Sequence, residues 1–422
     1  MIKNKRQLLK DFGEAKFLVE MAEEALEFLQ PENLIKNNFK KTSIPNSKEI
    51  ENIYVVGAGK ATYKMAKAIN ALFKGKIKDG VINVPVAITS KIGNIRVNKA
   101  AHPYPDENGL KGAKEILNIA KKATDKDLLI CLISGGGSAL MPLPAEGLSL
   151  ADKTNLTKQL LASRADIHEI NTVRKHISAI KGGRLAANTK AKLIGLYISD
   201  VLGDKIESIA SGPTVADKSK VEDALKILKK YNIDDEKIIE IIKNNESPKK
   251  IDKKRIQNFI IGSNRVVLKH LQSFAERQGY KVEIFIDKMK GEAKRMPAKI
   301  FKKSKPGKIS IFGGETVVKI IGKGQGGRNQ EMALSSAKSL PKNAVFMTLA
   351  TDGVDGVTDE PIAGAIISQK TIEQIKKDKI NIKKYLDTND SYNCLKKLNC
   401  LLKTGPSGTN VGDIAIILRS NS

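Results

Sequence analysis

Glycine-rich loops that carry polar side chains occur along most of this chain. They are GAGK (57–60), SGGGSAL (134–140), SDVLGD (199–204), SGP (211–213), GGE (313–315), GKGQGGRNQE (322–331) and TDGVDG (351–356). Several follow an apolar run and precede a helix-like pattern, where backbone N–H groups and the helix dipole can hold an anion. Two of the loops add a cation, Lys60 and Arg328. This combination predicts an enzyme that handles phosphate groups.

The first loop partly matches the dinucleotide-binding fingerprint GxGxxG. Gly57 and Gly59 supply the first two glycines, but Thr62 occupies the third position, and the next strand ends without an acid that could hold a ribose. The Walker A spacing, GxxxxGK followed by Ser or Thr, is absent as well. What remains is a strand, a turn and a helix with Lys60 at its start. This predicts contact with an oxyanion, and a simple tight turn is the alternative.

Three successive glycines in the second loop need an explanation, because glycine loses more backbone entropy on folding than any other residue. We expect a ligand or another backbone segment to approach closely at Gly135, Gly136 and Gly137. The hydroxyls of Ser134 and Ser138 could donate hydrogen bonds to a ligand. A serine nucleophile is not indicated, because the GxSxG motif is missing.

The loop at 322–331 places Arg328 at the start of a helix-like stretch, directly after a run of glycines. An arginine at such a position can pair bidentately with a phosphate or a carboxylate. A solvated helix start is the alternative. The residues predicted to bind a nucleotide in this half of the chain are Gly313, Gly314, Glu315, Gly326, Gly327, Asn329, Asp352 and Gly353.

Acidic residues accompany these loops. Asp200 ends a predicted strand, Glu315 follows two glycines, and Asp352 and Asp355 flank a third. Ligands of open α/β sheets bind at the carboxyl ends of strands, and carboxylate oxygens suit Mg²⁺. Asp200, Glu315 and Asp352 are therefore predicted metal ligands. Ordinary turn chemistry explains Asp352 and Asp355 equally well.

Histidines and cysteines add little. No two of the four histidines show metal-ligand spacing, and His102 lies in a loop that could face a site. The three cysteines form no CxxC pair, and Cys131 lies in an apolar strand, where a core position is expected.

The net charge of +27 comes mostly from lysines spread along helical segments. Aromatic residues make up only 5% of the chain, tryptophan is absent, and no aromatic-lined basic stripe appears. A solvated lysine-rich surface explains the charge, with a nucleic-acid-binding protein as the alternative. No stretch approaches the ~20 apolar residues that span a membrane, and the basic N-terminal segment lacks an apolar core, so a cytoplasmic location is expected.

The elements that position the loops alternate between strand and helix, which predicts a parallel α/β architecture. The predicted strands span 52–59, 81–88, 127–134 and 192–199, then 259–262, 281–286, a strand pair within 308–321, 344–353 and 413–418. Predicted helices include 6–29, 149–162 and 169–181, and the lysine-rich segment 217–256 is helical. A boundary near residue 245 divides the chain into domains 1–245 and 246–422.

Nine motifs in the chain together resemble a known family. They are GAGKAT, LISGGGSALMPLP, INTVRKHISAIKGGRLA, ISDVLGD, IASGPTV, GGETVV, GGRNQEMAL, LATDGVDG and the terminal GTNVGDI. In this order they are similar to the motifs of the class of glycerate 2-kinases whose C-terminal part is called the MOFRL domain. The resemblance covers nearly the whole chain, although 217–256 and 287–307 carry no motif. The co-occurrence is far more specific than any single loop.

The resemblance implies two α/β domains, an N-terminal Rossmann-like parallel sheet flanked by helices and a C-terminal MOFRL-type domain, with the active site in the interdomain cleft. It implies ATP-dependent phosphorylation of D-glycerate at the 2-hydroxyl, giving 2-phosphoglycerate and ADP, with Mg²⁺ or another divalent cation. We expect no nucleic-acid or membrane partner, and a homodimer is one option for assembly.

The resemblance also places catalytic residues. The lysine of the GAGK motif corresponds to Lys60, and the arginine of GGRNQE to Arg328. We expect both to contact the transferring phosphoryl group or the glycerate carboxylate. Asp200, alone or with Glu315 or Asp352, would hold Mg²⁺ or orient the 2-hydroxyl. Removal of Arg328 is expected to lower turnover far more than stability. The alternative is an NAD(P)H-dependent hydroxypyruvate reductase, a label that some relatives carry, and the incomplete fingerprint argues against it.

Overall fold

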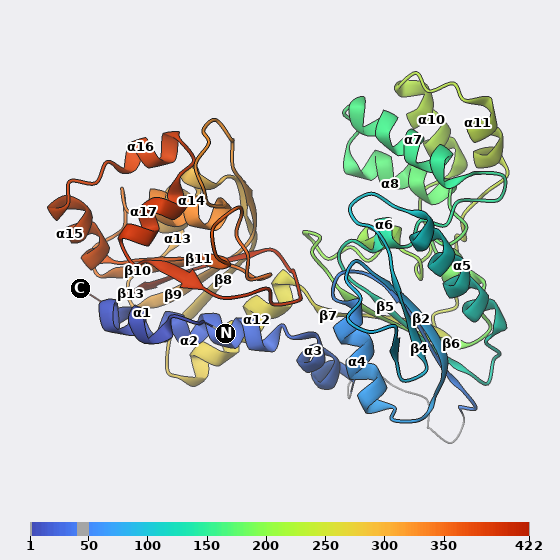
Figure 1. The fold of residues 1–422 in the computed structure, drawn as a ribbon, viewed down its shortest axis with the longest axis horizontal. Helices are drawn as coiled ribbons and strands as arrows, with labels where there is room; N and C mark the ends of the chain where they lie inside the picture. Colours follow the sequence, from blue (N-terminus) through green and yellow to red (C-terminus); the bar gives the residue numbers. More distant parts are fainter. Residues whose placement is uncertain (1, 40–49, 422) are drawn as a thin grey trace. The chain divides into compact units, whose positions relative to one another are not determined.

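The computed structural model describes residues 2–39 and 50–421 and separates the chain into two compact units (Figure 1). The central unit is Leu34–Ile261, and the terminal unit combines Met1–Asn33 with Gly262–Ser422. The sequence placed the boundary at 245, whereas the contacts place it after 261 and join the first 33 residues to the C-terminal half. Local sequence patterns carry no information on contacts between segments so far apart in the chain.

The central unit contains a seven-stranded sheet in the order β3-β4-β2-β1-β5-β6-β7. Its strands are β1 (Ile53–Ala58), β2 (Ile77–Val84), β3 (Lys91–Ile92), β4 (Ile95–Lys99), β5 (Leu128–Ile133), β6 (Lys192–Ile198) and β7 (Ile256–Gly262). β1 runs parallel to both β2 and β5, and β5 runs parallel to β6, which confirms the predicted parallel sheet. The carboxyl ends of β1, β5 and β6 therefore lie side by side at one edge of the sheet.

Some helices of the central unit form a layer of their own. The helices of this unit are α3 (Pro31–Phe39), α4 (Thr62–Leu72), α5 (Glu107–Lys122), α6 (Gly137–Leu140), α7 (Leu150–Ala162), α8 (Ile167–His176), α9 (Arg184–Ala187), η2 (Ile209–Ser211), α10 (Val221–Lys230) and α11 (Glu236–Lys243). Helices α7, α8, α10 and α11 share an apolar core of their own and form a separate four-helix layer (Figure 1). Leu156, Val173 and Leu228 belong to that core.

The predicted helix at 169–181 ends earlier than expected. α8 stops at His176, because the following residues pair with the segment before α7 instead of continuing the helix. Ser178 Oγ donates to the carbonyl of Leu143 at 2.9 Å and accepts from the N–H of Lys181 at 3.3 Å. This turn carries Lys181 to the edge of the glycine loop that follows β5. α7 begins with a capping box, in which Ser149 Oγ accepts from the N–H of Asp152.

The terminal unit contains a six-stranded sheet in the order β12-β11-β10-β13-β9-β8. Its strands are β8 (Val282–Glu292), β9 (Lys308–Val317), β10 (Ala344–Ala350), β11 (Ile362–Ile367), β12 (Leu401–Lys403) and β13 (Asp413–Arg419). β8 and β9 are parallel, but the other neighbouring strands pair antiparallel, so the parallel arrangement predicted for the whole chain does not extend here. β9 also runs through Gly313 and Gly314 as one strand, where the sequence suggested a strand pair.

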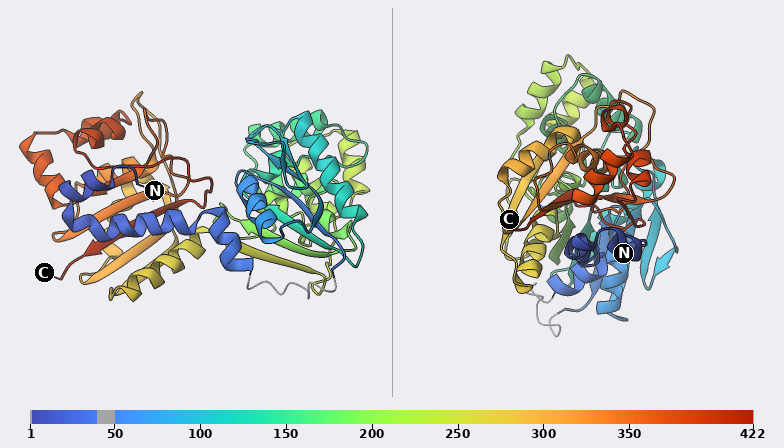
Figure 2. Two further views of the ribbon diagram at one scale, coloured as in Figure 1. Left: turned by 60° about the horizontal axis from the view of Figure 1, so that its bottom comes forward. Right: turned by 90° about the vertical axis from the view of Figure 1, so that its left-hand side faces the viewer.

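The helices of the terminal unit come from both ends of the chain. They are α1 (Lys5–Asp11), η1 (Gly13–Ala15), α2 (Lys16–Phe28), α12 (Asn264–Arg277), η3 (Ala293–Arg295), α13 (Met296–Lys303), α14 (Arg328–Ser336), α15 (Gln369–Lys377), α16 (Ile382–Asp387) and α17 (Ser391–Lys397). Figure 2 shows the blue N-terminal helices along the terminal unit. Phe28 of α2 stacks on His270 of α12 at 3.8 Å between ring centroids, and His270 Nε2 lies 2.6 Å from Glu24 Oε1. These contacts tie the N-terminal segment to the C-terminal half.

None of the helices described in residues 2–39 and 50–421 is long and apolar enough to cross a membrane. The three cysteines are buried, as expected for Cys131, whose thiol pKa is raised to about 12 by burial in β5.

Candidate functional site

The two glycine loops at the carboxyl ends of β1 and β5 interlock. Gly59 has φ +148°, and a Cβ at this position would lie 2.1 Å from Ser134 Oγ. That hydroxyl accepts a hydrogen bond from the N–H of Ala61 at 3.0 Å, and the N–H of Lys60 donates to the carbonyl of Gly135 at 2.9 Å. The start of α4 is therefore fixed against the loop after β5, and only glycine fits at position 59.

Other glycines of these loops also pack against the protein itself. A Cβ at Gly57 would lie 2.3 Å from the carbonyl oxygen of Leu132, and one at Gly137 would lie 3.0 Å from that of Ala58. Close approach of another backbone segment, one of the two explanations left open for the triple-glycine loop, accounts for Gly137, and Gly57 and Gly59 pack in the same way. Their predicted role in nucleotide binding, like that of Ser134, stays a prediction.

Three polar side chains from separate parts of the sequence converge on the middle of the loop after β5. A Cβ at Gly135 would lie 2.3 Å from Asp200 Oδ2, and one at Gly136 would lie 2.9 Å from His102 Nε2 and 3.5 Å from Lys60 Cγ. Gly136 has φ +82° and turns the chain here. The loop is thus surrounded by a cation, an imidazole and a carboxylate, of which Lys60 and Asp200 were predicted as catalytic residues.

The electrostatic setting brings the pKa values of His102 and Asp200 closer together. Desolvation raises the pKa of the Asp200 carboxyl above its ordinary value, and the charges of Lys60 and His102 only partly offset this. Desolvation, followed by repulsion from Lys60, lowers the pKa of His102. Asp200 accepts a proton more readily than an ordinary aspartate, and the His102 imidazole favours its neutral form. Lys60 itself is exposed to solvent.

A cavity of about 230 Å³ lies beside this loop and is lined by residues 134–138, by Asp200, and by Asn171 and Arg174 of α8. Its wall also includes Ala210, which directly precedes the SGP segment, and Ala210 and Ser211 have φ +51° and +59°. Non-glycine residues in this left-handed region carry conformational strain and are frequent at ligand sites. Ser138 Oγ and Ser211 Oγ are hydrogen bonded at 3.2 Å, which joins the two segments.

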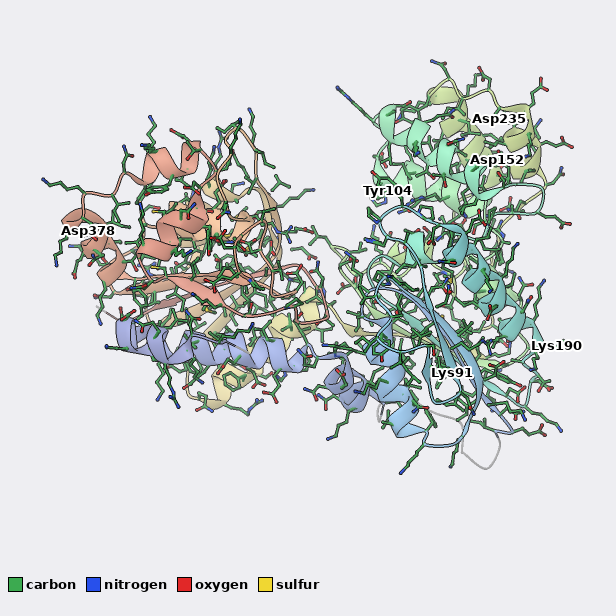
Figure 3. The ribbon with its side chains drawn as sticks, viewed as in Figure 1. Lys91, Tyr104, Asp152, Lys190, Asp235 and Asp378 are labelled. Atoms are coloured by element: carbon green, nitrogen blue, oxygen red, sulfur yellow. The ribbon has the colours of Figure 1, made fainter. Side chains whose placement is uncertain are left out.

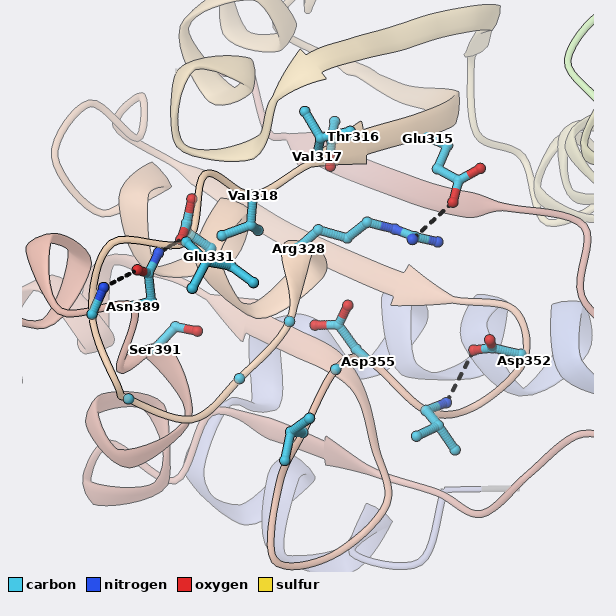
Figure 4. A pocket seen from close by; sticks show the side chains of 18 of the residues that line it. Glu315, Thr316, Val317, Val318, Arg328, Glu331, Asp352, Asp355, Asn389 and Ser391 are labelled. Atoms are coloured by element: carbon cyan, nitrogen blue, oxygen red, sulfur yellow. Dashed lines mark hydrogen bonds and ion pairs between the residues drawn. The ribbon is translucent and has the colours of Figure 1, made fainter. Parts of the chain in front are cut away.

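The terminal unit has its own pocket, of about 570 Å³ (Figure 4). Of the residues predicted in this half, Glu315, Gly326, Gly327, Arg328 and Asp352 line it. The others, Gly313, Gly314, Asn329 and Gly353, are not among the residues that line it. A Cβ at Gly313, Gly314 or Gly353 would lie within 2.3 Å of another residue, respectively Asn264 Oδ1, Met289 O and Gly405 O.

Arg328 is held at the pocket wall by two carboxylates. Its Nε donates to Asp413 Oδ2 at 2.6 Å and its Nη2 to Asp413 Oδ1 at 3.1 Å. Its Nη1 lies 2.8 Å from Glu315 Oε1 (Figure 4). Asp413 is fully buried at the start of β13 and also accepts from Asn329 Nδ2 at 2.9 Å. The bidentate pairing expected for Arg328 therefore exists, but its partner is a carboxylate of the protein.

Asp355 occupies the N-terminal end of α14. Its two carboxylate oxygens accept from the N–H groups of Asn329 at 3.0 Å and Gln330 at 2.8 Å. Burial, reinforced by the charge of Asp413, raises the pKa of Asp355 to about 6. These donors at the helix start are thus used internally, which corrects the expectation that this glycine-rich helix start presents them to a ligand. Asn329 is itself buried, and its N–H and side-chain Nδ2 donate to carboxylates of the protein.

The predicted metal ligands divide between the units, with Asp200 in the central unit and Glu315 and Asp352 in the terminal pocket. In the part of the chain that the structure describes, no group of three or more histidines, cysteines and acids is arranged to hold a metal. Mg²⁺ in phosphoryl-transfer enzymes is held by one or two carboxylates together with phosphate oxygens. A single acid such as Asp200 is compatible with that chemistry.

Two residues of the sites carried little or no signal in the sequence. His102 belongs to no metal or nucleophile motif, and only its loop suggested that it could face a site. Asp413 lies in the terminal GTNVGDI motif, 85 residues after its partner Arg328, and nothing local indicates the pairing.

Comparison with known proteins identifies relatives that cover nearly the whole chain. Residues 17–243 match a domain of unknown function, DUF4147, and residues 308–413 match the MOFRL family. The D-glycerate 2-kinase of Thermotoga maritima is 39% identical over 95% of this chain and 97% of its own. A crystal structure of glycerate kinase from Thermotoga maritima matches with a TM-score of 0.88, covering 96% of this chain and 98% of that one at 39% identity. A putative hydroxypyruvate reductase from Agrobacterium vitis is 37% identical, over 86% of each chain.

Proposed function

The chain belongs to the glycerate 2-kinase family with a MOFRL domain, and from this we propose that it transfers the γ-phosphoryl group of ATP to the 2-hydroxyl of D-glycerate. The products are 2-phosphoglycerate and ADP. The observation that carries the proposal is the convergence of Lys60, His102 and Asp200 on the glycine loop at the carboxyl ends of β1 and β5. The strand order reverses at this point of the sheet, where open α/β folds bind their ligands.

The residues of the central unit supply the chemistry that phosphoryl transfer needs. Catalysis of this reaction consists mainly of positioning the reactants and neutralising charge on the moving group. The ammonium of Lys60 neutralises a phosphoryl oxygen. Asp200 accepts the proton of the 2-hydroxyl as the new O–P bond forms and the bond to the leaving ADP breaks. Its raised pKa suits this role, since a general base works best when its pKa is near the operating pH.

Arg328, in the terminal unit, supplies a second cation for an anionic group of the substrates. The buried Asp413 fixes its position, whereas Glu315 is the more exposed of its two partners. An anionic substrate group at Nη1 takes the place of Glu315 without disturbing the pair with Asp413. Contact of Arg328 with the transferring phosphoryl group or with the glycerate carboxylate stays a prediction.

A divalent cation such as Mg²⁺ would be held by Asp200 together with phosphate oxygens, and it would neutralise charge on the phosphate chain. Glu315 and Asp352 are the alternative ligands, in the terminal pocket. The interdomain position of the active site, the cytoplasmic location and the lack of a nucleic-acid partner stay predictions from the sequence.

The test is an assay with ATP, Mg²⁺ and D-glycerate, coupled to enolase with no phosphoglycerate mutase added. Enolase consumes 2-phosphoglycerate directly, so a signal under these conditions also identifies the 2-hydroxyl as the acceptor. ADP formation without an enolase signal would mean that another position or another acceptor is phosphorylated. Phosphorus NMR of the product distinguishes these two cases.

A second candidate function follows from the relative named as a putative hydroxypyruvate reductase. It requires a nicotinamide site, but Thr62 replaces the third glycine of the fingerprint and the ribose-binding acid is absent. The discriminating measurement is the loss of NAD(P)H absorbance with hydroxypyruvate in the absence of ATP. We expect no loss above the background rate.

A further inference from the structure

Three cations of the central unit face one cavity without a carboxylate to balance them. The cavity, of about 280 Å³, is lined by Lys153 of α7, Arg174 of α8 and Lys181 of the turn after α8. We call it the cation pocket. Lys153 is 6% exposed and Lys181 only 1% exposed. Among the described residues, none of the three has an acidic side chain within ion-pair distance.

The two lysines have only neutral partners. Lys181 Nζ donates to the carbonyl of Ser138 at 2.9 Å and to Ser138 Oγ at 3.1 Å. Lys153 Nζ donates to the carbonyl of Leu143 at 3.2 Å. The acid next to Lys153 in the sequence, Asp152, pairs instead with Lys237 at 2.8 Å.

A neighbouring lysine shows the usual arrangement. Lys175, also on α8 and almost as buried, forms an ion pair with the buried Asp217. At this position the chain balances a buried lysine with an acid. In the cation pocket it does not, and a buried charge without a partner is costly.

The three cations also destabilise one another's charged forms. Burial lowers the pKa of Lys153 and Lys181 well below its ordinary value. The charge of Arg174 lowers both further, and that of Lys153 lowers the pKa of Lys181. A bound anion would reverse this effect, because each cation would gain a partner of opposite charge.

We propose that the cation pocket is a binding subsite for a phosphate group. Up to three positive charges face the cavity, and the exposed Lys158 lies at its lining as well. A carboxylate would balance one of these charges, whereas a phosphate dianion or a polyphosphate balances two or more. The proposal rests on the proposed function only for the source of the phosphate, which is either the nucleotide or the phosphorylated product.

The position of the pocket links it to the glycine loop. Ser138 and Arg174 line both the cation pocket and the cavity beside Asp200. Lys181 fixes Ser138 through two hydrogen bonds, which its Nζ donates to the carbonyl and to the hydroxyl of that serine. Tyr104, 71% exposed, lies at the pocket on the loop that faces the four-helix layer (Figure 3). A phosphate bound here would lie at the same loop as Lys60 and Asp200.

Lys153→Met is the most informative variant. Methionine has a similar shape, and the carbonyl of Leu143 keeps two other donors, Ser178 Oγ at 2.9 Å and the N–H of Ala179 at 3.3 Å. Lys181→Met is the second variant. Lys226→Met on α10 removes the same charge from an exposed position of the four-helix layer and controls for the basic surface.

Binding of pyrophosphate and inorganic phosphate to each protein is measured by calorimetry and thermal shift, without turnover. We expect Lys153→Met and Lys181→Met to bind pyrophosphate about tenfold more weakly or worse, the effect of losing one charged hydrogen bond. Lys226→Met should match the wild type. The Tm of ligand-free Lys153→Met should equal or exceed that of the wild type, which a structural role of the ammonium would not allow.

Parallel titrations with ATP and with 2-phosphoglycerate identify the source. Weaker binding of ATP alone assigns the subsite to the nucleotide, and weaker binding of 2-phosphoglycerate alone assigns it to the transferred group. Binding of every phosphate probe with wild-type affinity by both variants would overturn the proposal. A titration with D-glycerate is added, and weaker binding of D-glycerate alone would overturn the proposal as well. Binding is measured directly and does not depend on activity. If the wild type shows no kinase activity but the two variants bind pyrophosphate more weakly than it does, the proposed function is refuted and the subsite stands.

Discussion

Arg328 and Asp413 form a bidentate ion pair that joins the first residue of α14 to the first residue of β13. The two contacts measure 2.6 Å and 3.1 Å, and the carboxylate is fully buried. A buried carboxylate that loses its cation is left with an uncompensated charge. This pair therefore changes the expectation that removal of Arg328 affects turnover far more than stability, because both should fall.

We expect Arg328→Met to lower the free energy of unfolding by about 3–5 kcal/mol, the usual cost of removing one partner of a buried ion pair. The double variant Arg328→Met/Asp413→Asn should recover part of this loss, since it also removes the stranded charge. Chemical denaturation in a double-mutant cycle measures both effects. A loss below about 1 kcal/mol in the single variant, the size of an ordinary substitution, would contradict the buried pairing.

Lys60 allows function to be separated from stability, because its side chain is exposed. We expect Lys60→Met to lower kcat/KM for phosphoryl transfer by about 100-fold or more, as the loss of one preorganised charge typically does. Its free energy of unfolding should stay within about 0.5 kcal/mol of the wild type.

The matched control is Lys67→Met, which removes an exposed lysine from α4, the helix that begins two residues after Lys60, at a position about two turns away from the loop. It should leave both quantities unchanged. If Lys60→Met and Lys67→Met have equal kcat/KM values, a catalytic role for Lys60 is refuted.

Gly59→Ala tests the interlocking of the two loops. The new Cβ would lie 2.1 Å from Ser134 Oγ and 2.7 Å from the carbonyl oxygen of that residue, and φ is +148°. We expect a loss of stability of about 2 kcal/mol or more, because overpacking and backbone strain each cost roughly 1–3 kcal/mol. Gly75→Ala also has positive φ, at +75°, but no atom within 4 Å, so it should cost only about 1 kcal/mol. Similar losses in both variants would mean that contact with Ser134 is not the cause.

Asp355 predicts a pH dependence of stability. Its pKa is about 6 in the folded protein against an ordinary value of 3.8, so the folded state binds this proton more tightly. The stabilisation that results is complete below pH 3.8 and is lost as the pH rises through about 6. The loss amounts to about 3 kcal/mol, at 1.36 kcal/mol for each pKa unit.

The measurement compares wild type and Asp355→Asn by denaturation between pH 4 and pH 7.5, the range that covers this titration. The variant has no proton to release at this position, so its stability should fall less with rising pH. Carboxyls with lowered pKa, such as Glu169 at about 2, titrate below this range and are the same in both proteins. Parallel curves would show that Asp355 does not titrate here.

Much of the central unit could be predicted from the sequence. The apolar runs that end in glycine loops became β1, β5 and β6, with boundaries within one residue of those expected. Parallel pairing then follows, because helices separate these strands. The terminal unit was less predictable. Its strands carry similar apolar runs, but antiparallel pairing of β10 with β11 and β13 depends on contacts between distant segments.

The sequence by itself determined the residue types at the candidate site and their places at the ends of strands. Lys60, Asp200 and Arg328 were singled out from local patterns, since a glycine loop beside a charge is a local feature, and the family resemblance then implied catalytic roles for Lys60 and Arg328. Tertiary structure decided which partners these residues have. His102 beside Lys60, Asp413 beneath Arg328, and two buried lysines without an acid all depend on contacts across tens of residues, and burial determines whether such a charge is solvated, paired or ready for a ligand.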